Sequence, residues 1–249
     1  MIVYPNAKIN LGLNVLKKRA DGYHEISSVF YPVKELVDIL EIIPDEDFYF
    51  SSSGIVIPGN SNICAKAFDL LKADFGIGNV KIHLHKKIPI GAGLGGGSAD
   101  GAFTLIALNE LFELKLSNIE LEKYALQLGA DCPFFIENTS KYVAGIGEKM
   151  FAIDLDLSEF ELKFIFPDLH ISTAEAYGGV TPDIPEHNLL DAIKHPIYNW
   201  KEEVRNDFEV SAFAKYPQLA KMKAKLYADG AIYASMTGSG SVIYGVLRK

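Results

Sequence analysis

The chain has 249 residues, of which 49% are hydrophobic and 22% are charged, so it can bury a sizeable core and is not disordered as its main state. At about 150 residues per domain, this length gives one or two domains. The formal net charge of -8 excludes a protein that works mainly by neutralising nucleic-acid phosphates or by lying on an anionic membrane.

Cysteine content and hydropathy indicate the compartment. Cys64 and Cys132 lie far apart and form no CxxC pair, which is typical of a reducing compartment and offers no metal framework. Pro5, Asn6 and Lys8 interrupt the N-terminus before an apolar stretch long enough for a signal peptide, and no run of about 18 apolar residues follows anywhere. We therefore expect a cytoplasmic protein without a membrane-spanning helix.

Alternation of apolar and polar residues predicts strands in the first part of the chain. Residues 7–15 alternate almost perfectly, with Lys8 and Asn10 on the polar face. Further strand-like runs cover residues 26–33, 36–43 and 80–85, and the last of these alternates as well. An antiparallel sheet that is open on one side suits this pattern better than a parallel sheet.

Capping residues mark three predicted helices. Ser61 and Asn62 precede a pattern of apolar residues at helical spacing. A second helix is expected from about Ser98 to Leu111. A third begins with the capping-box spacing of residues 117–120 and ends before Gly129.

The remaining elements suggest a second domain. Strands are expected near residues 141–144 and 149–153, and the pattern restarts after an acidic stretch at residues 154–159. Later elements comprise a strand at 162–166, two helices between 198 and 227, and strands at 231–236 and 242–247. We place a boundary near residue 155, which divides the chain into domains 1–155 and 156–249.

A glycine-rich turn is the strongest signal in the sequence. It follows a predicted strand, precedes a predicted helix and reads Pro89, Ile90, Gly91, Ala92, Gly93, Leu94, Gly95, Gly96, Gly97, Ser98, Ala99. Glycines let backbone N–H groups approach an anion at a helix N-terminus, which indicates phosphate binding. A simple tight turn is the alternative reading, but it would need only one or two glycines.

The turn belongs to none of the commoner nucleotide motifs. Gly91, Gly93 and Gly96 formally match GxGxxG, yet the preceding strand alternates with polar residues instead of reading as a buried parallel strand. The chain has no GxxxxGK[ST] loop and lacks the protein-kinase HRD segment.

Three segments, in order along the chain, resemble the GHMP kinases, a family of small-molecule kinases. They are Ala-Lys-Ile-Asn-Leu at residues 7–11, the glycine-rich loop at 89–98, and Thr-Gly-Ser-Gly at 237–240. The resemblance implies an α+β fold with two lobes, an N-terminal lobe like ribosomal protein S5 domain 2 and a C-terminal ferredoxin-like lobe. It also implies that ATP and the acceptor meet in a cleft.

Residues 21–24 and 129–135 resemble one branch of that family, whose acceptor is a methylerythritol that carries a cytidine diphosphate group. The resemblance implies transfer of the γ-phosphoryl group of ATP to the 2-hydroxyl of this acceptor, a step of non-mevalonate isoprenoid biosynthesis. A homoserine or mevalonate kinase of the same family remains an alternative. A non-catalytic ATP sensor and a dinucleotide-dependent oxidoreductase are alternatives from other classes.

Two residues are candidates for catalysis. Asp131 follows a predicted helix and can accept a proton, although such an aspartate can also simply cap a turn. A lysine in mid-strand such as Lys8 is usually solvated. The resemblance implies that Asp131 is the general base and that Lys8 lies beside it, where its ammonium stabilises phosphoryl oxygens.

Four residues are candidates for acceptor binding. Asn10 shares the strand face of Lys8 and can hydrogen-bond near the substrate hydroxyl. Tyr23 and His24 offer an aromatic face and two ring nitrogens, which suit a nucleobase, although a surface turn would look similar. The resemblance implies that these two hold the cytosine, with Tyr177 flanking the same base.

For ATP, the resemblance implies contacts from Asn62 and Lys86 on the adenine side and a role for Ser98 in arranging Mg²⁺ and the phosphates. Ala99 departs from the family, which commonly has a serine there, so no hydroxyl role is expected at this position. The partners expected are ATP with magnesium and a small molecule carrying a cytidine diphosphate group. We expect no nucleic acid or membrane partner, and a monomer or weak homodimer.

Overall fold

The computed structural model describes residues 1–59 and 62–249, which form two compact units that we treat separately. The first comprises Met1–Lys8, Pro32–Ile90 and Gly95–Thr139; the second comprises Ile9–Tyr31, Gly91–Leu94 and Ser140–Lys249. The boundary near residue 155 stays a prediction about the family's two domains. Among the described residues, no helix has the length and apolar character needed to cross a membrane.

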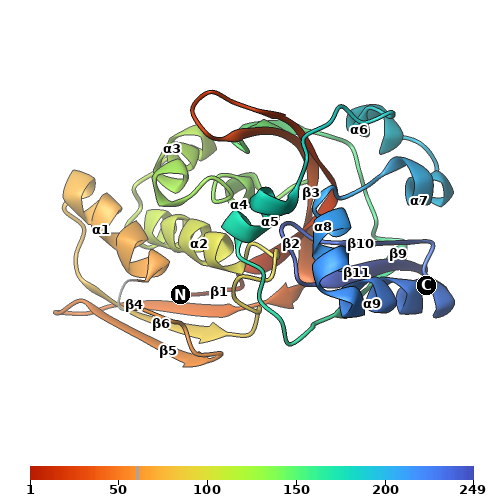
Figure 1. Cartoon of the computed structure of the whole chain (residues 1–249). Helices are drawn as coiled ribbons and strands as arrows, with labels where there is room; N and C mark the ends of the chain where they lie inside the picture. The colour runs from red at the N-terminus through yellow and green to blue at the C-terminus, as the bar shows by residue number, and fades with distance from the viewer. Residues whose placement is uncertain (60–61) are drawn as a thin grey trace. The chain divides into compact units, whose positions relative to one another are not determined.

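The first unit contains a sheet in the order β1-β4-β6-β5. Its strands are β1 (Ile2–Val3), β4 (Ile39–Pro44), β5 (Tyr49–Gly54) and β6 (Val80–Lys86). In β6, Ile82 and Leu84 are buried while Lys81 is exposed, as the alternation predicts. The buried face is covered by helices, of which α1 and α2 lie over the sheet in Figure 1.

The prediction of an antiparallel sheet is wrong for one pair of strands. β1, β4 and β6 pair antiparallel, but β5 pairs parallel with β6, with Tyr49 opposite Lys81. The reason is the crossover through α1, which returns the chain to the sheet in the same direction. The sequence of β5 contains a run of serines and gives little strand signal.

The helices of the first unit follow the predicted caps. They are α1 (Ile63–Phe75), α2 (Gly96–Leu111), α3 (Asn118–Leu128) and the short α4 (Phe134–Glu137). The side chain of Asn62 caps α1, whereas Ser61 lies outside the described residues. The capping box of Ser117 and Glu120 at the start of α3 is confirmed.

The second unit contains two sheets. One has the order β2-β3-β7-β8, formed by β2 (Asn6–Lys18), β3 (His24–Val37), β7 (Lys141–Gly145) and β8 (Lys149–Ala152). The first three residues of β2 and the last six of β3 are counted with the first unit. The other has the order β10-β11-β9, formed by β9 (Phe160–Ile165), β10 (Tyr233–Met236) and β11 (Ile243–Arg248). The predicted break between the strands at residues 26–33 and 36–43 is misplaced, because β3 continues to Val37 and β4 begins only after Asp38.

Helices complete the second unit. They are α5 (Thr173–Gly179), α6 (Leu189–Ala192), η1 (Ile197–Asn199), α7 (Trp200–Glu203), α8 (Phe208–Lys215) and α9 (Pro217–Ala228). Figure 1 shows α9 against β11. Leu219 and Leu226 of α9 join Phe208, Met236 and Ile243 in a buried apolar cluster.

Candidate active site

The phosphate loop ends at an α-helix whose first N–H groups lack a side-chain cap. Gly95 is the N-cap residue of α2 with φ of 70°, a conformation that favours glycine. A Cβ on Gly95 would lie 3.0 Å from Cγ of Lys8 and 3.1 Å from the ring of Phe135, so the turn packs tightly there. A Cβ on Gly97 would meet nothing within 4 Å. The first turn of α2 is therefore open to an anion at Gly97.

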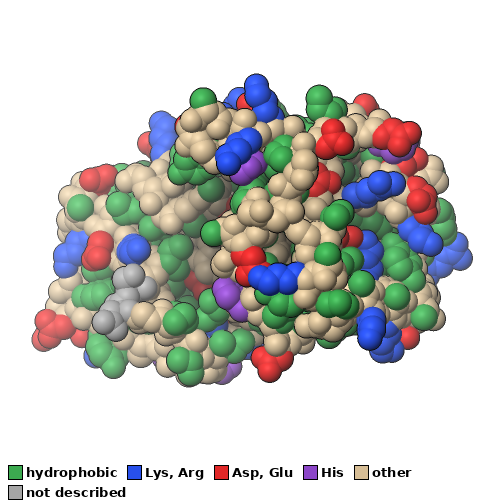
Figure 2. Space-filling model, in the orientation of Figure 1, with side chains coloured by type: hydrophobic (Ala, Val, Ile, Leu, Met, Phe, Trp, Pro, Cys, Tyr) green, Lys and Arg blue, Asp and Glu red, His purple; other side chains and the backbone are tan. Residues whose placement is uncertain are grey.

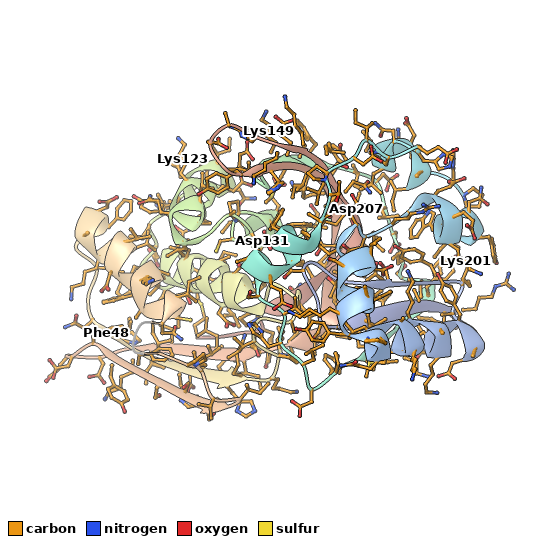
Figure 3. The ribbon with its side chains drawn as sticks, viewed as in Figure 1. Phe48, Lys123, Asp131, Lys149, Lys201 and Asp207 are labelled. Carbon is orange, nitrogen blue, oxygen red and sulfur yellow. The ribbon has the colours of Figure 1, made fainter. Side chains whose placement is uncertain are left out.

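Lys8 and Asp131 lie together in the first unit. Lys8 Nζ is 3.6 Å from Asp131 Oδ2; the lysine side chain is 4% exposed and the aspartate side chain 36%. Burial lowers the pKa of Lys8, and the charge of Asp131 opposes that shift. Figure 3 shows Asp131 in the turn between α3 and α4. The arrangement leaves the carboxylate accessible and places a cation beside it.

Lys86 is held inside the first unit. Its ammonium forms ion pairs with Asp38 and Asp100, and the residue is only 3% exposed. This burial corrects the expectation of a direct contact between the ammonium and ATP. The side chain lies instead beneath the first residue of α2, since a Cβ on Gly96 would be 3.0 Å from Lys86 Nζ.

Residues 91–94 of the loop pack within the second unit against the turn after β10. A Cβ on Gly93 would lie 2.0 Å from the carbonyl oxygen of Thr237, so only glycine fits. The Thr237 hydroxyl is 3.0 Å from the carbonyl oxygen of Gly93, to which it can donate. Asn206 donates to the carbonyl oxygens of Met236 and Gly238 at 2.8 and 2.9 Å and so holds the turn.

Asn10 belongs to the same network. Its backbone N–H donates to Thr237 Oγ1 at 3.1 Å, and its side-chain amide donates to Ser28 Oγ at 2.8 Å. The Tyr244 hydroxyl donates to the Asn10 carbonyl oxygen at 2.7 Å. These bonds fix the orientation of the Asn10 side chain, and its contact with a substrate hydroxyl stays a prediction.

The structure brings together two of the residues predicted to hold a base. The rings of His24 and Tyr177 stack with centroids 4.9 Å apart and an angle of 22°. Phe208 packs edge-on against Tyr177 at 4.9 Å. Tyr23 does not join this stack in any described contact and is 61% exposed. The stack offers an aromatic surface in the second unit.

The remaining predicted ATP residues occupy the ends of helices. The carboxamide oxygen of Asn62 accepts the N–H of Cys64 at 2.7 Å, so it caps α1. Ser98 lies in the first turn of α2, where its hydroxyl interacts with the thiol of Cys132. Burial raises the pKa of Cys132 to about 11, so this thiol is neutral at physiological pH. Ala99 is fully buried in α2, and its place among the ATP-binding residues stays a prediction.

Sequence reasoning missed several residues that support the loop. His170 touches the loop through Gly91, with Nδ1 3.2 Å from the Gly91 carbonyl oxygen. Asp38 and Asp100 hold Lys86. The available signal was a charged residue within an otherwise apolar segment at Asp38 and Asp100, whereas His170 has no such signal.

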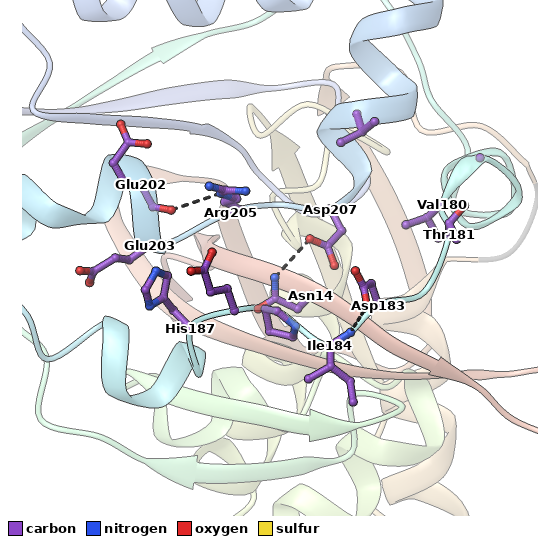
Figure 4. A pocket seen from close by; sticks show the side chains of 14 residues that line it. Asn14, Val180, Thr181, Asp183, Ile184, His187, Glu202, Glu203, Arg205 and Asp207 are labelled. Atoms are coloured by element: carbon purple, nitrogen blue, oxygen red, sulfur yellow. Dashed lines mark hydrogen bonds between the residues drawn. The ribbon is translucent and has the colours of Figure 1, made fainter.

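A separate hollow of about 490 Å³ lies in the second unit beside Asn14 and Asp207 (Figure 4). Asp207 accepts hydrogen bonds from the Asn14 side chain at 3.2 Å and the Val15 N–H at 2.7 Å, and burial raises its pKa. The acidic side chains of its lining are Asp183, Glu186, Glu202, Glu203 and Asp207. This excess of carboxylates disfavours a nucleotide phosphate there.

Family models match both parts of the chain. The GHMP kinases N terminal domain matches residues 62–138, which include the phosphate loop and Asp131, and the GHMP kinases C terminal domain matches residues 189–249. A mevalonate kinase structure with 15% identity and a TM-score of 0.73 covers 100% of this chain and 91% of its own, which shows the shared fold. The predicted α+β fold class is confirmed.

More similar proteins span nearly the whole chain. Proteins named 4-diphosphocytidyl-2-C-methyl-D-erythritol kinase from Bacteroides thetaiotaomicron and Azobacteroides pseudotrichonymphae are 49% and 48% identical, covering 100% of this chain and 92% and 94% of their own. A crystal structure of 4-(cytidine 5'-diphospho)-2C-methyl-D-erythritol kinase has 32% identity and a TM-score of 0.84 and covers 99% of this chain and 90% of its own. With both domain models and full-length relatives in agreement, the chain belongs to the GHMP kinase family.

Proposed function

We propose that this protein transfers the γ-phosphoryl group of ATP to the 2-hydroxyl of 4-diphosphocytidyl-2-C-methyl-D-erythritol, a step of isoprenoid precursor biosynthesis. The observation that carries the proposal is the 49% identity, over the whole chain, to a kinase of that name. The matched span covers the whole chain and so includes both the phosphate loop and the aromatic stack. The chain is accordingly an ATP-dependent small-molecule kinase.

The Lys8 and Asp131 pair supports the chemistry. Phosphoryl transfer needs an in-line hydroxyl, a proton acceptor and neutralisation of the phosphoryl oxygens. Asp131 accepts the proton of the 2-hydroxyl as the new O–P bond forms and the bond to the β-phosphate oxygen breaks, leaving ADP. Lys8, 3.6 Å away, provides the positive charge next to the reacting groups.

The loop supports ATP as the donor. The uncapped first turn of α2 and the open space at Gly97 suit a polyphosphate, because helix N-terminal N–H groups stabilise negative charge. Asn62 and the loop residues 89–99 are the groups that we assign to the nucleotide. Lys86 packs against Gly96, the first residue of α2.

Magnesium fits this site when it arrives with the nucleotide. The described residues contain no group of three or more His, Cys, Asp or Glu side chains able to hold a metal ion. Mg²⁺ usually keeps several waters and binds through substrate phosphates and one or two protein groups, for which the Ser98 hydroxyl is suited. It would neutralise charge on the phosphates.

His24, Tyr177 and Tyr23 are the residues that we assign to the cytosine. Stacking suits a base because every base has an apolar face, and the ring nitrogens of His24 can read its edge. Asn10 is assigned to the acceptor near its hydroxyl. The acceptor's two phosphates are repelled by the acidic hollow at Asp207, which is therefore not its site.

The surface charge bears on the partners that we propose for this protein. Figure 2 shows acidic and basic side chains interspersed over the face in view, and the net charge is -8. Both features support a small-molecule acceptor without a nucleic-acid or membrane partner. We propose a cytoplasmic enzyme that is a monomer or weak homodimer, which sedimentation at several concentrations would test.

Steady-state assays with a panel of acceptors test the proposed function. We expect turnover with the diphosphocytidyl alcohol and none with homoserine or mevalonate. Turnover of homoserine or mevalonate alone would assign the chain to another kinase of the family. ATP binding without turnover of any acceptor would indicate a sensor.

A further inference from the structure

The chain just before α8 lies along β2 in the second unit. Asn206 is 2% exposed and pairs with Leu13 in a parallel β-bridge. Beside it, the Leu13 N–H donates to the Arg205 carbonyl oxygen at 2.9 Å, and the Asp207 N–H donates to the Leu13 carbonyl oxygen at 2.8 Å. Residues 205–207 are therefore bonded to β2 like a short added strand, which fixes the backbone of Asn206.

The side chain of Asn206 uses both ends of its amide. Its Nδ2 donates to the carbonyl oxygens of Met236 and Gly238 at 2.8 and 2.9 Å, on either side of Thr237. Its Oδ1 accepts the Phe208 N–H at 3.0 Å. These partners determine which end is the nitrogen, because two carbonyl oxygens can accept only from N–H groups.

Glu209 bonds the N–H group of Met236, whereas Asn206 bonds its carbonyl group. Oε1 of Glu209 accepts the Met236 N–H at 2.8 Å and the Ser235 hydroxyl at 3.0 Å. Its Oε2 pairs with Lys223 Nζ at 2.5 Å, and its side chain is 12% exposed. Both backbone groups of Met236 are thus bonded to side chains from the N-terminal end of α8. We call Asn206 and Glu209 the turn clamp.

The turn that the clamp holds packs directly against the phosphate loop. The Thr237 hydroxyl is 3.0 Å from the Gly93 carbonyl oxygen, and a Cβ on Gly238 would lie 3.0 Å from Gly93 Cα. The Asn10 N–H donates to Thr237 Oγ1 at 3.1 Å and orients that hydroxyl. With so little space between them, a displacement of the turn must also displace residues 91–94 or break the hydrogen bond to Gly93.

We propose that Asn206 and Glu209 are positioning residues for ATP binding, which act through Thr237 on residues 91–94 of the phosphate loop. Backbone N–H groups bind an anion well when their directions are fixed before the ligand arrives. Without the clamp, the nucleotide itself would have to order the loop, at a cost in affinity. The inference rests on the proposed function in that ATP is the ligand of this loop.

The dissociation constant of ATP tests the clamp. It is measured by calorimetry without acceptor, at a temperature where thermal unfolding shows each variant to be folded. We expect Asn206→Ala to weaken ATP binding by about tenfold, the scale of one or two lost hydrogen bonds. An unchanged dissociation constant in folded Asn206→Ala would overturn the proposal.

Asn188→Ala is the matched control for Asn206→Ala. Oδ1 of Asn188 accepts the Leu190 N–H at 2.9 Å at the start of α6, just as Oδ1 of Asn206 accepts the Phe208 N–H at the start of α8. Both substitutions remove a helix cap, but of the two residues Asn206 is the one that bonds the turn. We expect wild-type ATP affinity in Asn188→Ala.

A double-mutant cycle tests whether the clamp acts through Thr237. Thr237→Val keeps the branched shape and removes the hydroxyl that contacts Gly93. We expect Thr237→Val alone to weaken ATP binding by about tenfold, and the addition of Asn206→Ala to weaken it little further. Two independent effects would multiply to about a hundredfold, and that result would overturn the proposal.

Glu209 provides a second test if Asn206→Ala does not fold. Glu209→Gln retains an oxygen that accepts the Met236 N–H and should bind ATP like the wild type, whereas Glu209→Ala should bind it about five- to tenfold more weakly. Lys223→Met removes the charge beside Glu209 and leaves the bonds to the strand, so it should not change the affinity. Equal ATP affinities in Glu209→Ala and Glu209→Gln would overturn the proposal.

These outcomes separate the inference from the proposed function. ATP affinity that depends on Asn206, in a protein that phosphorylates no acceptor, would overturn the function alone. Turnover of the diphosphocytidyl alcohol, with wild-type ATP affinity in Asn206→Ala and Glu209→Ala, would overturn the inference alone. Absence of ATP binding by the wild type would overturn both.

Discussion

Asp131 and Lys8 form an ion pair in which the carboxylate is partly exposed and the ammonium is buried. The Asp131 carboxylate is accessible to a substrate. The Lys8 ammonium is enclosed by the protein, and its Nζ lies 3.6 Å from Asp131 Oδ2. A buried lysine is costly without an anionic partner, so the pair is also required for the stability of Lys8 in this place.

At Asp131, replacement by asparagine preserves shape but removes the proton acceptor. We expect Asp131→Asn to lower kcat by about two orders of magnitude or more, the usual contribution of a general base, with little change in ATP affinity. Rapid-quench turnover and calorimetry would measure the two quantities, with Asp47→Asn as the control. Near-normal kcat in Asp131→Asn would remove this residue from the mechanism.

Tyr177 tests the assignment of the cytosine. Tyr177→Leu keeps an apolar contact with Phe208 but loses the stacking face, which is worth about 1–3 kcal/mol per base. We expect KM for the diphosphocytidyl acceptor to rise by about five- to a hundredfold and KM for ATP to stay unchanged. Tyr4→Leu, at an exposed tyrosine, serves as the matched control. An unchanged acceptor KM would place the base elsewhere.

The N-terminal turn of α2 is the element that we propose binds the nucleotide, and its glycines differ in the space around them. Gly95 has positive φ and contacts Lys8, so any side chain there disturbs the fold as well as the ligand. Gly97 has open space around its Cβ position and no positive φ. Of these two glycines, only Gly97 can be substituted to test ATP binding without also disturbing the fold.

Gly97→Ala should therefore weaken ATP binding without destabilising the protein. A methyl group would stand where the phosphates approach, while alanine favours the helix over glycine by up to about 1 kcal/mol. Calorimetry and thermal unfolding would measure the two effects. Gly178→Ala, another site with open space and no positive φ, is the control. Unchanged affinity in Gly97→Ala would mean that the phosphates do not approach this turn.

Local signals in the sequence were sufficient for most helices and for the loop. The capping box at Ser117, the cap at Asn62 and the alternation in β6 each act over a few residues, and each predicted its element. The parallel pairing of β5 with β6 could not be predicted, because it depends on a crossover and not on the residues of β5. Local patterns cannot identify partners that lie far away in the chain.

The same limit applies to the site. Family resemblance predicted the Lys8 and Asp131 pair and the aromatic residues. It did not predict that Lys86 is buried between Asp38 and Asp100, since 48 residues separate Lys86 from Asp38. The alternation of β6 does place Lys86 on the same face as the buried Ile82 and Leu84, but the carboxylates that pair with it there are a tertiary property.

For the whole molecule, ligand binding and stability are linked. ATP at a hundred times its dissociation constant should raise the free energy of unfolding by about 2.7 kcal/mol, because it binds only the folded chain. For a protein of this size that corresponds to about 5–10 °C in Tm. Thermal unfolding with ATP, and with a nicotinamide dinucleotide as the comparison, would measure it. An equal shift with the dinucleotide would contradict the assignment of the loop to ATP.

The bond between Thr237 and Gly93 has a consequence for biosynthesis. It joins positions 144 residues apart, so a ribosome adds Thr237 long after Gly93. A nascent chain therefore carries the phosphate loop long before it possesses the support for residues 91–94. Nucleotide capture should begin only after Thr237 has left the ribosome, so a chain stalled shortly before Thr237 would be unable to use ATP as a folding ligand.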